Sequence, residues 1–203
     1  MRVVVFGATG KTGRHVCQAA LDRGHEVTAF GRSVEHLDQR PGLAIHRGDV
    51  FDTGAVGNAV DGHDGAIVCL GSTGLRDKTT LSVGTQVVVD AMIANDVPRL
   101  VVMSAAGVGE SWAQIPFSSK LLFRTMLRNV FADHVRQETL VTQSPLGWTI
   151  VRPAVLNDSS GSGTYVATNT GPITKISRAD VAACLADQLE TSEHGRRCIS
   201  VTN

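Results

Sequence analysis

Three glycines follow one another at intervals of three residues in the segment VVVFGATGKTGRHV, residues 3–16. Gly7 allows a tight turn, Gly10 lets backbone N–H groups approach an anion, and Gly13 lets the following helix pack against the preceding strand. The N-terminus of that helix favours negative charge, because its first N–H groups lack partners and the helix dipole is positive there. The segment therefore predicts a pyrophosphate site. The alternative, a turn without a ligand, is disfavoured by the apolar strand before it and the helix after it.

Side chains around this loop and at the end of the next strand refine the expected ligand. Thr9, Lys11 and Thr12 belong to the loop itself. The second strand ends in Gly31, Arg32 and Ser33, with no acid before position 35. An enzyme that uses NAD places Asp or Glu there against the ribose hydroxyls, whereas a guanidinium offers a planar fork of donors to a phosphate. We expect Arg32 to bind the 2′-phosphate of NADP, the alternative being a solvated surface arginine.

The ends of the remaining strands supply the other candidate contacts, because ligands of such sheets bind beyond the carboxyl ends of the strands. Asp49 and Val50 are expected near the adenine, and Ser104 near the nicotinamide. At the end of the fourth strand, residues 69–71 place a small residue where the backbone must approach the cofactor. The rest of the predicted cofactor-binding set is Cys69, Leu70, Gly71, Ala105, Arg152 and Pro153.

Alternating apolar and helical segments indicate how these residues are positioned. Strands are expected at 3–6, 25–33, 42–50, 64–72, 100–103, 147–156 and 197–203, and helices after Gly13 and over 79–95, about 120–143 and 178–190. This alternation predicts an α/β fold, a Rossmann-like doubly wound parallel sheet with helices on both faces. Residues 1–203 are expected to form one domain. A flexible surface loop at 157–164 and a short hairpin between 164–169 and 172–177 are also expected, and Ser177 with Asp180 resembles a capping box.

Composition narrows the classes of function. Nineteen acidic and nineteen basic residues balance, which argues against nucleic acid or an anionic membrane as a partner. No apolar stretch reaches the roughly 18 residues of a membrane span, and no signal-peptide pattern is visible. Neither the histidines nor the cysteines have the spacing of metal ligands, so no metal is expected. The four cysteines are typical of a reduced cytoplasmic protein; they are Cys17, Cys69, Cys184 and Cys198. We also expect the protein to be a monomer.

Several of these motifs together resemble a known family along essentially the whole chain. They are FGATGKTG at 6–13, GR at 31–32, GDV at 48–50, LG at 70–71, SA at 104–105, DHVR at 133–136 and GPITKISRADVA from position 171. The sequence is similar to the atypical short-chain dehydrogenase/reductases, and within them to the biliverdin-IXβ reductase/flavin reductase family. The resemblance implies a small NADPH-dependent reductase for flavins, bilins or similar flat acceptors. It also implies that Ser104 lies beside the nicotinamide and that the loop after it roofs an open substrate site.

The chain departs from its relatives at two points that bear on chemistry. Short-chain dehydrogenases that oxidise alcohols use a Tyr-x-x-x-Lys pair, but the only tyrosine here is Tyr165, and Pro116 stands four residues before Lys120. The family's histidine after the proline of the sixth strand is replaced by Ala154. We therefore expect hydride transfer to an electron-poor ring, after which the reduced ring takes a proton from water. Ser104 is the only candidate catalytic side chain.

The loop after the fifth strand carries the candidate substrate contacts. Trp112 and Phe117 are expected to stack on a flat acceptor, although they could simply anchor the loop to the core. Arg124 and Lys120 could meet an acidic group of the substrate, although ordinary surface charge accounts for them too. A second functional class stays open: a redox sensor of the nitrogen-regulator type, which binds NADP(H) and reports to a protein partner without turnover. The absence of an added tail or domain argues against the sensor.

Overall fold

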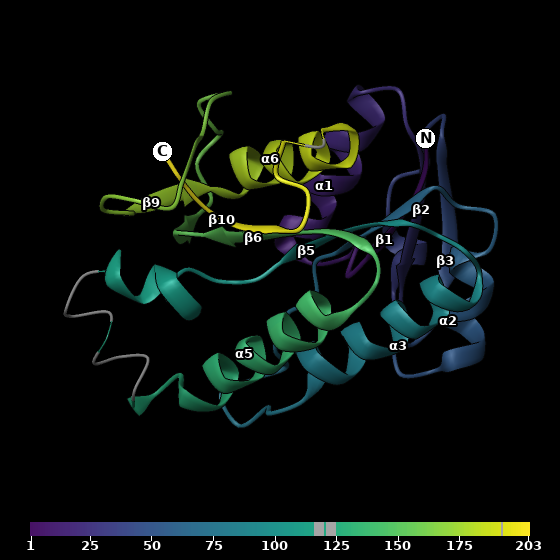
Figure 1. The fold of residues 1–203 in the computed structure, drawn as a ribbon. Coiled ribbons are helices and arrows are strands. Elements are labelled where there is room, and N and C mark those ends of the chain that lie inside the picture. Colours follow the sequence, from purple (N-terminus) through teal and green to yellow (C-terminus); the bar gives the residue numbers. More distant parts are fainter. Residues whose placement is uncertain (116–119, 121–124, 192) are drawn as a thin grey trace.

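A mostly parallel eight-stranded sheet forms the centre of the protein (Figure 1). The computed structural model describes residues 1–115, 120, 125–191 and 193–203. The strands stand in the order β3, β2, β1, β4, β5, β6, β10, β8, and all neighbouring pairs are parallel except β10 with β8. Their bounds are β1 Arg2–Phe6, β2 Glu26–Gly31, β3 Leu43–Arg47, β4 Gly65–Val68, β5 Arg99–Met103, β6 Gly147–Pro153, β8 Val166–Thr168 and β10 Arg197–Thr202.

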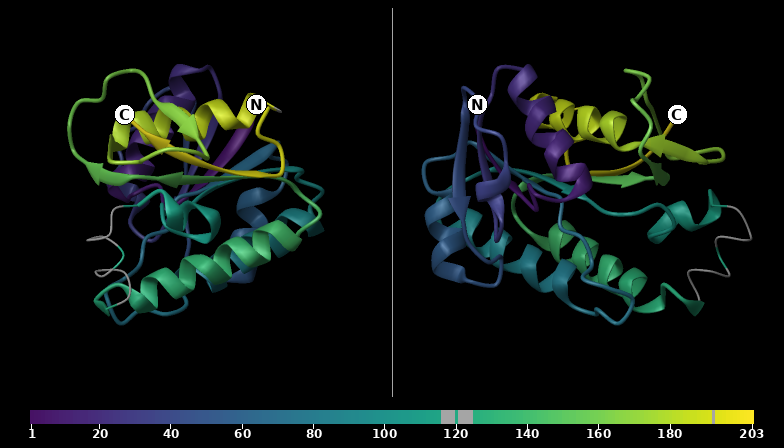
Figure 2. Two further views of the ribbon diagram at one scale, coloured as in Figure 1. Left: turned by 60° about the vertical axis from the view of Figure 1, so that its left-hand side comes forward. Right: turned by 180° about the vertical axis from the view of Figure 1, so that it is seen from behind.

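Helices cover both faces of this sheet. Figures 1 and 2 show α1 and α6 packed side by side on one face and α2, α3 and α5 on the other. Their bounds are α1 Lys11–Asp22, α2 Thr53–Val60, α3 Thr80–Ala94, α5 Arg128–Gln143 and α6 Arg178–Glu190, with short 3-10 turns η1 Val34–His36 and η2 Gly109–Ala113. The predicted doubly wound, Rossmann-like fold is confirmed.

Strand β1 shows why the apolar run at its start leads to this architecture. Val3 and Val5 belong to the hydrophobic core under α1 and α6, whereas Val4 and Phe6 belong to the core on the opposite face. All four side chains are completely buried. Successive residues of a strand point to opposite faces, so an unbroken apolar run needs helices on both sides.

The expected hairpin near the C-terminus is wrong. β8 pairs antiparallel with β10 and so extends the main sheet, whereas β9 (Lys175–Ser177) pairs in parallel with β7 (Val155–Asn157) in a separate small sheet. Both segments pair with strands distant in the chain instead of with each other. The Gln114 side chain contacts the connection between them, since its amide Nε2 donates to the carbonyls of Thr168 at 3.5 Å and Gly171 at 3.2 Å.

The start of α6 fastens the surface loop that the sequence placed at 157–164. The Ser177 hydroxyl caps the helix by accepting from the Asp180 amide at 2.9 Å, as the capping box predicts. The Asp180 carboxylate, however, accepts from the amides of Ser162 and Gly163, both at 3.0 Å. The loop is largely exposed, and its backbone is held to α6 by this one buried side chain.

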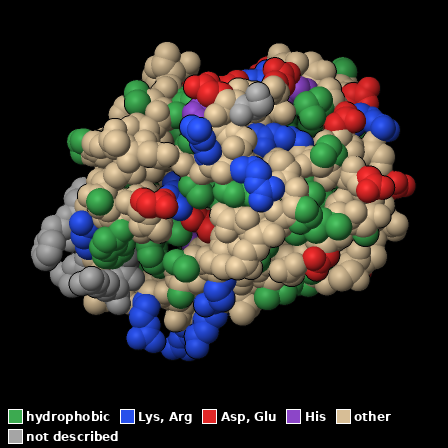
Figure 3. All heavy atoms as spheres, viewed as in Figure 1, with side chains coloured by type: hydrophobic (Ala, Val, Ile, Leu, Met, Phe, Trp, Pro, Cys, Tyr) green, Lys and Arg blue, Asp and Glu red, His purple; other side chains and the backbone are tan. Residues whose placement is uncertain are grey.

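The helical stretch expected over about 120–143 is interrupted by a turn, since Lys120 and Thr125 are helical and α5 begins at Arg128. Met126 and Leu127 lie in a turn, and the pair at 122–123 lies outside the described residues. No helix within the described ranges is long and apolar enough to cross a membrane. Figure 3 shows acidic and basic side chains interspersed over one face, with Lys and Arg side chains gathered at its lower edge.

Burial of His25 predicts that stability rises with pH in the weakly acidic range. The side chain is 5% exposed, and its Nδ1 lies 3.4 Å from the N-terminal ammonium. Burial and the ammonium lower the pKa of His25, only partly opposed by Glu190. The unfolded chain therefore takes up a proton first as the pH falls below about 6.5, which favours unfolding.

We expect the free energy of unfolding to decrease from pH 7.5 to pH 5, with a shallower slope in His25→Gln. Urea denaturation at several pH values measures both slopes. Equal slopes in the two proteins would contradict this assignment.

Candidate functional site

The loop between β1 and α1 forms an open cradle. Gly7 has φ +80°, and a Cβ there would lie 2.5 Å from the carbonyl oxygen of Cys69. A Cβ on Gly13 would lie 2.1 Å from the carbonyl oxygen of Gly7, whereas one on Gly10 would meet only that same oxygen, at 3.2 Å. Gly7 and Gly13 therefore permit backbone contact, while the outer side of Gly10 faces free space. Gly10 is also the N-cap of α1, whose first turn carries no acid, so the positive end of this helix is not neutralised.

A cleft of about 350 Å³ runs from this cradle across the ends of four strands. It brings together predicted residues that are far apart in the sequence: Gly7, Thr9, Gly10, Arg32, Asp49, Val50, Cys69, Leu70 and Gly71. Arg32 is exposed, and it forms no ion pair with any residue that the structure describes. Its guanidinium is therefore free to meet an anion in the cleft.

Other residues predicted for the cofactor lie beside the cleft instead of lining it. Thr12 is buried in the first turn of α1, and Ser33 is exposed at the start of η1. The Lys11 ammonium lies 3.3 Å from the Asp158 carboxylate, which also binds Arg178. Lys11 therefore connects the cradle to the loop that Asp180 fastens.

Additional lining residues were not among the sequence predictions. They are Phe30, Gly31, Gly48, Phe51, Ser72, Thr73 and Thr80. Asp77 shapes the loop between β4 and α3, because its carboxylate accepts from the amides of Thr73 at 2.8 Å and Thr79 at 3.1 Å. Burial alone would raise the pKa of Asp77, but these hydrogen bonds outweigh it and hold the pKa well below its usual range. The cluster of Ser and Thr after Gly71 was the available signal.

Ser104 stands where β5 ends, and the sequence analysis missed its contact with His134. The Ser104 side chain is buried, and its Oγ lies 3.5 Å from Nδ1 of His134 on α5. Burial lowers the pKa of His134, and a hydrogen bond to Gln137 and the charge of Glu138 oppose this shift only in part. The imidazole is therefore neutral near pH 7. Because no metal-ligand spacing involves His134, its only signal in the sequence is membership of the DHVR motif.

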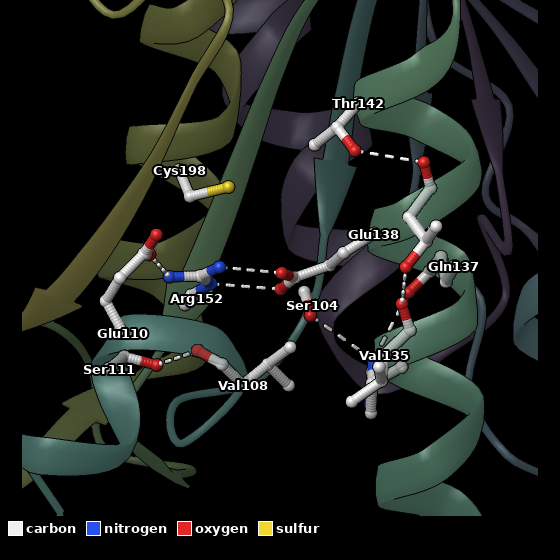
Figure 4. A network of polar contacts seen from close by, with 12 residues as sticks. Ser104, Val108, Glu110, Ser111, Val135, Gln137, Glu138, Thr142, Arg152 and Cys198 are labelled. Atoms are coloured by element: carbon white, nitrogen blue, oxygen red, sulfur yellow. Dashed lines mark hydrogen bonds and ion pairs between the residues drawn. The ribbon is translucent and has the colours of Figure 1, made fainter.

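Arg152 lies in a buried ionic network (Figure 4). Its guanidinium binds both oxygens of Glu138, at 3.0 and 2.7 Å, and one oxygen of Glu110 at 3.2 Å. These contacts join β6 to α5 and to η2. The Arg152 side chain therefore has a structural role. The prediction that Arg152 and Pro153 contact the cofactor stays untested, and such a contact would involve their backbone.

Of the two aromatic residues predicted to contact the substrate, the structure describes Trp112. Trp112 packs edge-on against Phe131, with ring centroids 5.7 Å apart, and the Lys120 ammonium lies 5.8 Å from the Trp112 ring centre. Trp112 also contacts the core below α1 and α6, which supports its anchoring role. The candidates Phe117 and Arg124 lie outside the described residues.

The fold and the cleft together define a class of protein, a Rossmann-fold binder of a dinucleotide. Residues 7–192 match the sequence profile of the family described as NAD(P)H-binding, so the chain belongs to this family. The predicted binding of a nicotinamide dinucleotide is confirmed.

Three individual proteins illustrate what the chain is similar to in sequence and fold. The uncharacterised protein YwnB of Bacillus subtilis is 24% identical over 216 residues, which cover 100% of this chain and 99% of YwnB. Among solved structures, ChuY of Escherichia coli O157:H7, named an anaerobilin reductase, superposes with a TM-score of 0.83 at 22% identity, covering 100% of this chain and 97% of ChuY. A short-chain dehydrogenase/reductase of Veillonella parvula in complex with NADP gives a TM-score of 0.85 at 17% identity, covering 100% and 94%.

We expect the chain to bind NADPH about ten- to a hundred-fold more tightly than NADH. This is the effect of a phosphate contact of roughly 1.5 to 3 kcal/mol at Arg32. Arg32→Asp should erase most of the preference, as measured by fluorescence titration of both cofactors. Arg197→Asp, the same charge change at an exposed position where β10 begins, should leave it unchanged. Equal affinities in the unmodified protein would refute this role of Arg32.

We also expect Gly10→Val to weaken NADPH binding by more than about a hundred-fold while the protein stays folded, because the new side chain fills the cradle and its Cβ meets the backbone only at the Gly7 carbonyl oxygen, at 3.2 Å. Titration with NADPH and circular dichroism measure the two effects. Gly57→Val, at a glycine of α2 with open space around it, should keep its affinity. Unchanged binding by Gly10→Val would show that the loop holds no phosphate.

Proposed function

We propose that the protein is an NADPH-dependent reductase that passes a hydride to a flat conjugated acceptor, such as a flavin, a quinone or a bilin. The observation that carries this proposal is the cleft, where the open cradle at Gly10 and the exposed Arg32 share one cavity. Ser104 stands at the corresponding end of a nearby strand in the same sheet. The arrangement offers separate places for a pyrophosphate, a further phosphate and a reacting ring.

The residues present fit the dinucleotide, because a Cβ at Gly10 would occupy the space that a pyrophosphate needs. Residues 7–13 would hold that group, Arg32 and Ser33 the 2′-phosphate, and Asp49 with Val50 the adenine. Residues 69–71 would lie along the cofactor backbone and Ser104 with Ala105 beside the nicotinamide. Bound NADPH supplies the hydride, and the chain contributes binding, orientation and a water-poor surface.

The proton is expected to come from water, because the described residues contain no tyrosine–lysine acid pair. The Tyr165 hydroxyl donates to the Asp187 carboxylate of α6 at 2.9 Å. Burial raises the pKa of Tyr165, and the charge of Asp187 raises it further. This hydroxyl is thus a poor acid. Acceptors whose reduced form tolerates a negative charge, such as flavins and quinones, suit a site of this kind.

A flat acceptor with an acidic group would bind beside the loop after β5, as the sequence predicts. Trp112 presents an indole whose neighbour is the Lys120 ammonium, and Phe117 and Arg124 complete the proposed substrate contacts. ChuY, by its name an anaerobilin reductase, supports inclusion of bilins. Where the bilin-reducing pattern has a histidine, this chain has Ala154, which is buried and cannot donate a proton.

We expect the purified protein to oxidise NADPH in the presence of at least one of FMN, riboflavin, a quinone or a bilin. Ser104→Ala should lower the rate by about ten-fold, or roughly 1.4 kcal/mol, because the serine contributes a hydrogen bond and not the proton. Tyr165→Phe should keep the rate of the unmodified protein. Absorbance of NADPH at 340 nm measures all three proteins.

Two outcomes would change the proposal. A dedicated acid contributes about a hundred- to ten-thousand-fold, so a thousand-fold loss in Ser104→Ala or Tyr165→Phe with NADPH binding intact would refute the solvent-proton mechanism. Tight NADPH binding without reduction of any acceptor would favour the alternative of a redox sensor that acts on a protein partner.

A further inference from the structure

His134 is the one histidine that contacts a candidate catalytic side chain among the described residues. It projects from α5, and its Nδ1 lies 3.5 Å from Oγ of Ser104 and 3.2 Å from Oε1 of Gln137. The distance to Ser104 is at the long end of hydrogen bonding, and such contacts in a site without its ligands tighten when the ligands bind. One ring nitrogen thus faces two oxygen atoms.

Gln137 decides which ring nitrogen carries the proton. Its side chain is fully buried, as is that of Thr85 on α3. In the amide orientation of the structure, Nε2 donates to the Thr85 hydroxyl at 2.9 Å, so the amide carbonyl faces His134. A buried carbonyl needs a donor. The neutral imidazole therefore carries its proton on Nδ1 and donates it towards Gln137.

This tautomer excludes Nδ1 of His134 as an acceptor for the Ser104 hydroxyl. Because Nδ1 bears a proton, Ser104 Oγ can only accept from it, and the hydroxyl's own proton is left for another acceptor. The Ser104 backbone cannot turn away, because its amide donates to the Val151 carbonyl at 2.8 Å. The serine thus stands at the end of β5 with a hydroxyl proton that His134 Nδ1 cannot accept.

We propose that His134 is a positioning residue, held as its Nδ1–H tautomer by Gln137 so that the Ser104 hydroxyl donates to a carbonyl oxygen bound at the end of β5. This inference rests on the proposed function. The carbonyl belongs either to the nicotinamide carboxamide or to the acceptor, and both present the same chemistry to the serine. Thr85, Gln137, His134 and Ser104 then form one chain of contacts from α3 to the site.

The tautomer can be measured without any turnover. Long-range ¹H–¹⁵N spectra of the histidine-labelled protein at pH 7.5 should show His134 with a protonated Nδ1 and an unprotonated Nε2. In Gln137→Leu the carbonyl is removed, and the fraction of the Nδ1–H form should fall. A protonated Nε2 in the unmodified protein would overturn the inference, whether or not any acceptor is reduced.

Substitutions test the effect on Ser104. His134→Leu should lower kcat about ten-fold, as Ser104→Ala does, and the double variant should match the single ones, because both remove the same oriented donor. His134→Asn places an amide N–H near the position of Nδ1 and should recover most of the rate. His63→Asn is the matched control, since both nitrogens of His63 are also engaged, with Thr28 and the Asp61 carbonyl, before the start of β4.

The two sources of the carbonyl are distinguished by binding. If the nicotinamide accepts the hydrogen bond, Ser104→Ala and His134→Leu weaken NADPH binding by a similar factor; if the acceptor does, NADPH affinity is unchanged and KM or kcat for the acceptor shifts. Additive losses in the double variant, or an equal defect in folded His134→Asn and His134→Leu, would overturn the positioning role. Failure of the unmodified protein to reduce any acceptor would instead refute the proposed function, leaving the tautomer and NADPH-affinity tests in place.

Discussion

The site depends on a contact made by backbone alone, where β1, β4 and the first turn of α1 meet. The Gly7 turn lies against the Cys69 carbonyl, and Gly13 lies against the Gly7 carbonyl, so neither position has room for a side chain. This contact sets where α1 begins and how closely it approaches the sheet. It also leaves Gly10 on the outer side of the turn, facing the cleft. The cradle is therefore a consequence of close packing between two strands and a helix.

Much of this arrangement could be predicted from local sequence. A run of β-branched residues followed at once by spaced glycines determines a buried parallel strand, a tight turn and a helix start. Parallel strands bring their carboxyl ends to one edge of the sheet, which is why Arg32, Asp49 and Gly71 share a cleft although they are far apart in the chain. The composition of each strand end was sufficient for this inference, without any knowledge of side-chain contacts.

The parts that escaped prediction depend on partners distant in sequence. β8 and β9 are three residues each, too short to show which strand they pair with. The N-terminus of α3 is capped only in part by its own segment, where Asp77 accepts from the Thr80 amide at 3.2 Å. A distant side chain, Asp133 of α5, completes the cap by accepting from the Leu81 amide at 2.8 Å. The contact of His134 with Ser104 likewise joins two elements 30 residues apart. No local pattern encodes such pairings.

The Arg152 network has a consequence for how the substrate loop can evolve. Of its two acids, Glu138 is 7% exposed and Glu110 is 92% exposed. Loss of a buried partner leaves an uncompensated charge and destabilises by about 3 to 5 kcal/mol, whereas the interaction with an acid exposed to solvent is screened by water and contributes less. Mutations at Glu110 can therefore shift η2, and Trp112 with it, while the sheet and α5 keep their structure. If η2 borders the acceptor, as proposed, acceptor range and fold stability are separable traits, and lineages can diversify in the first without endangering the second.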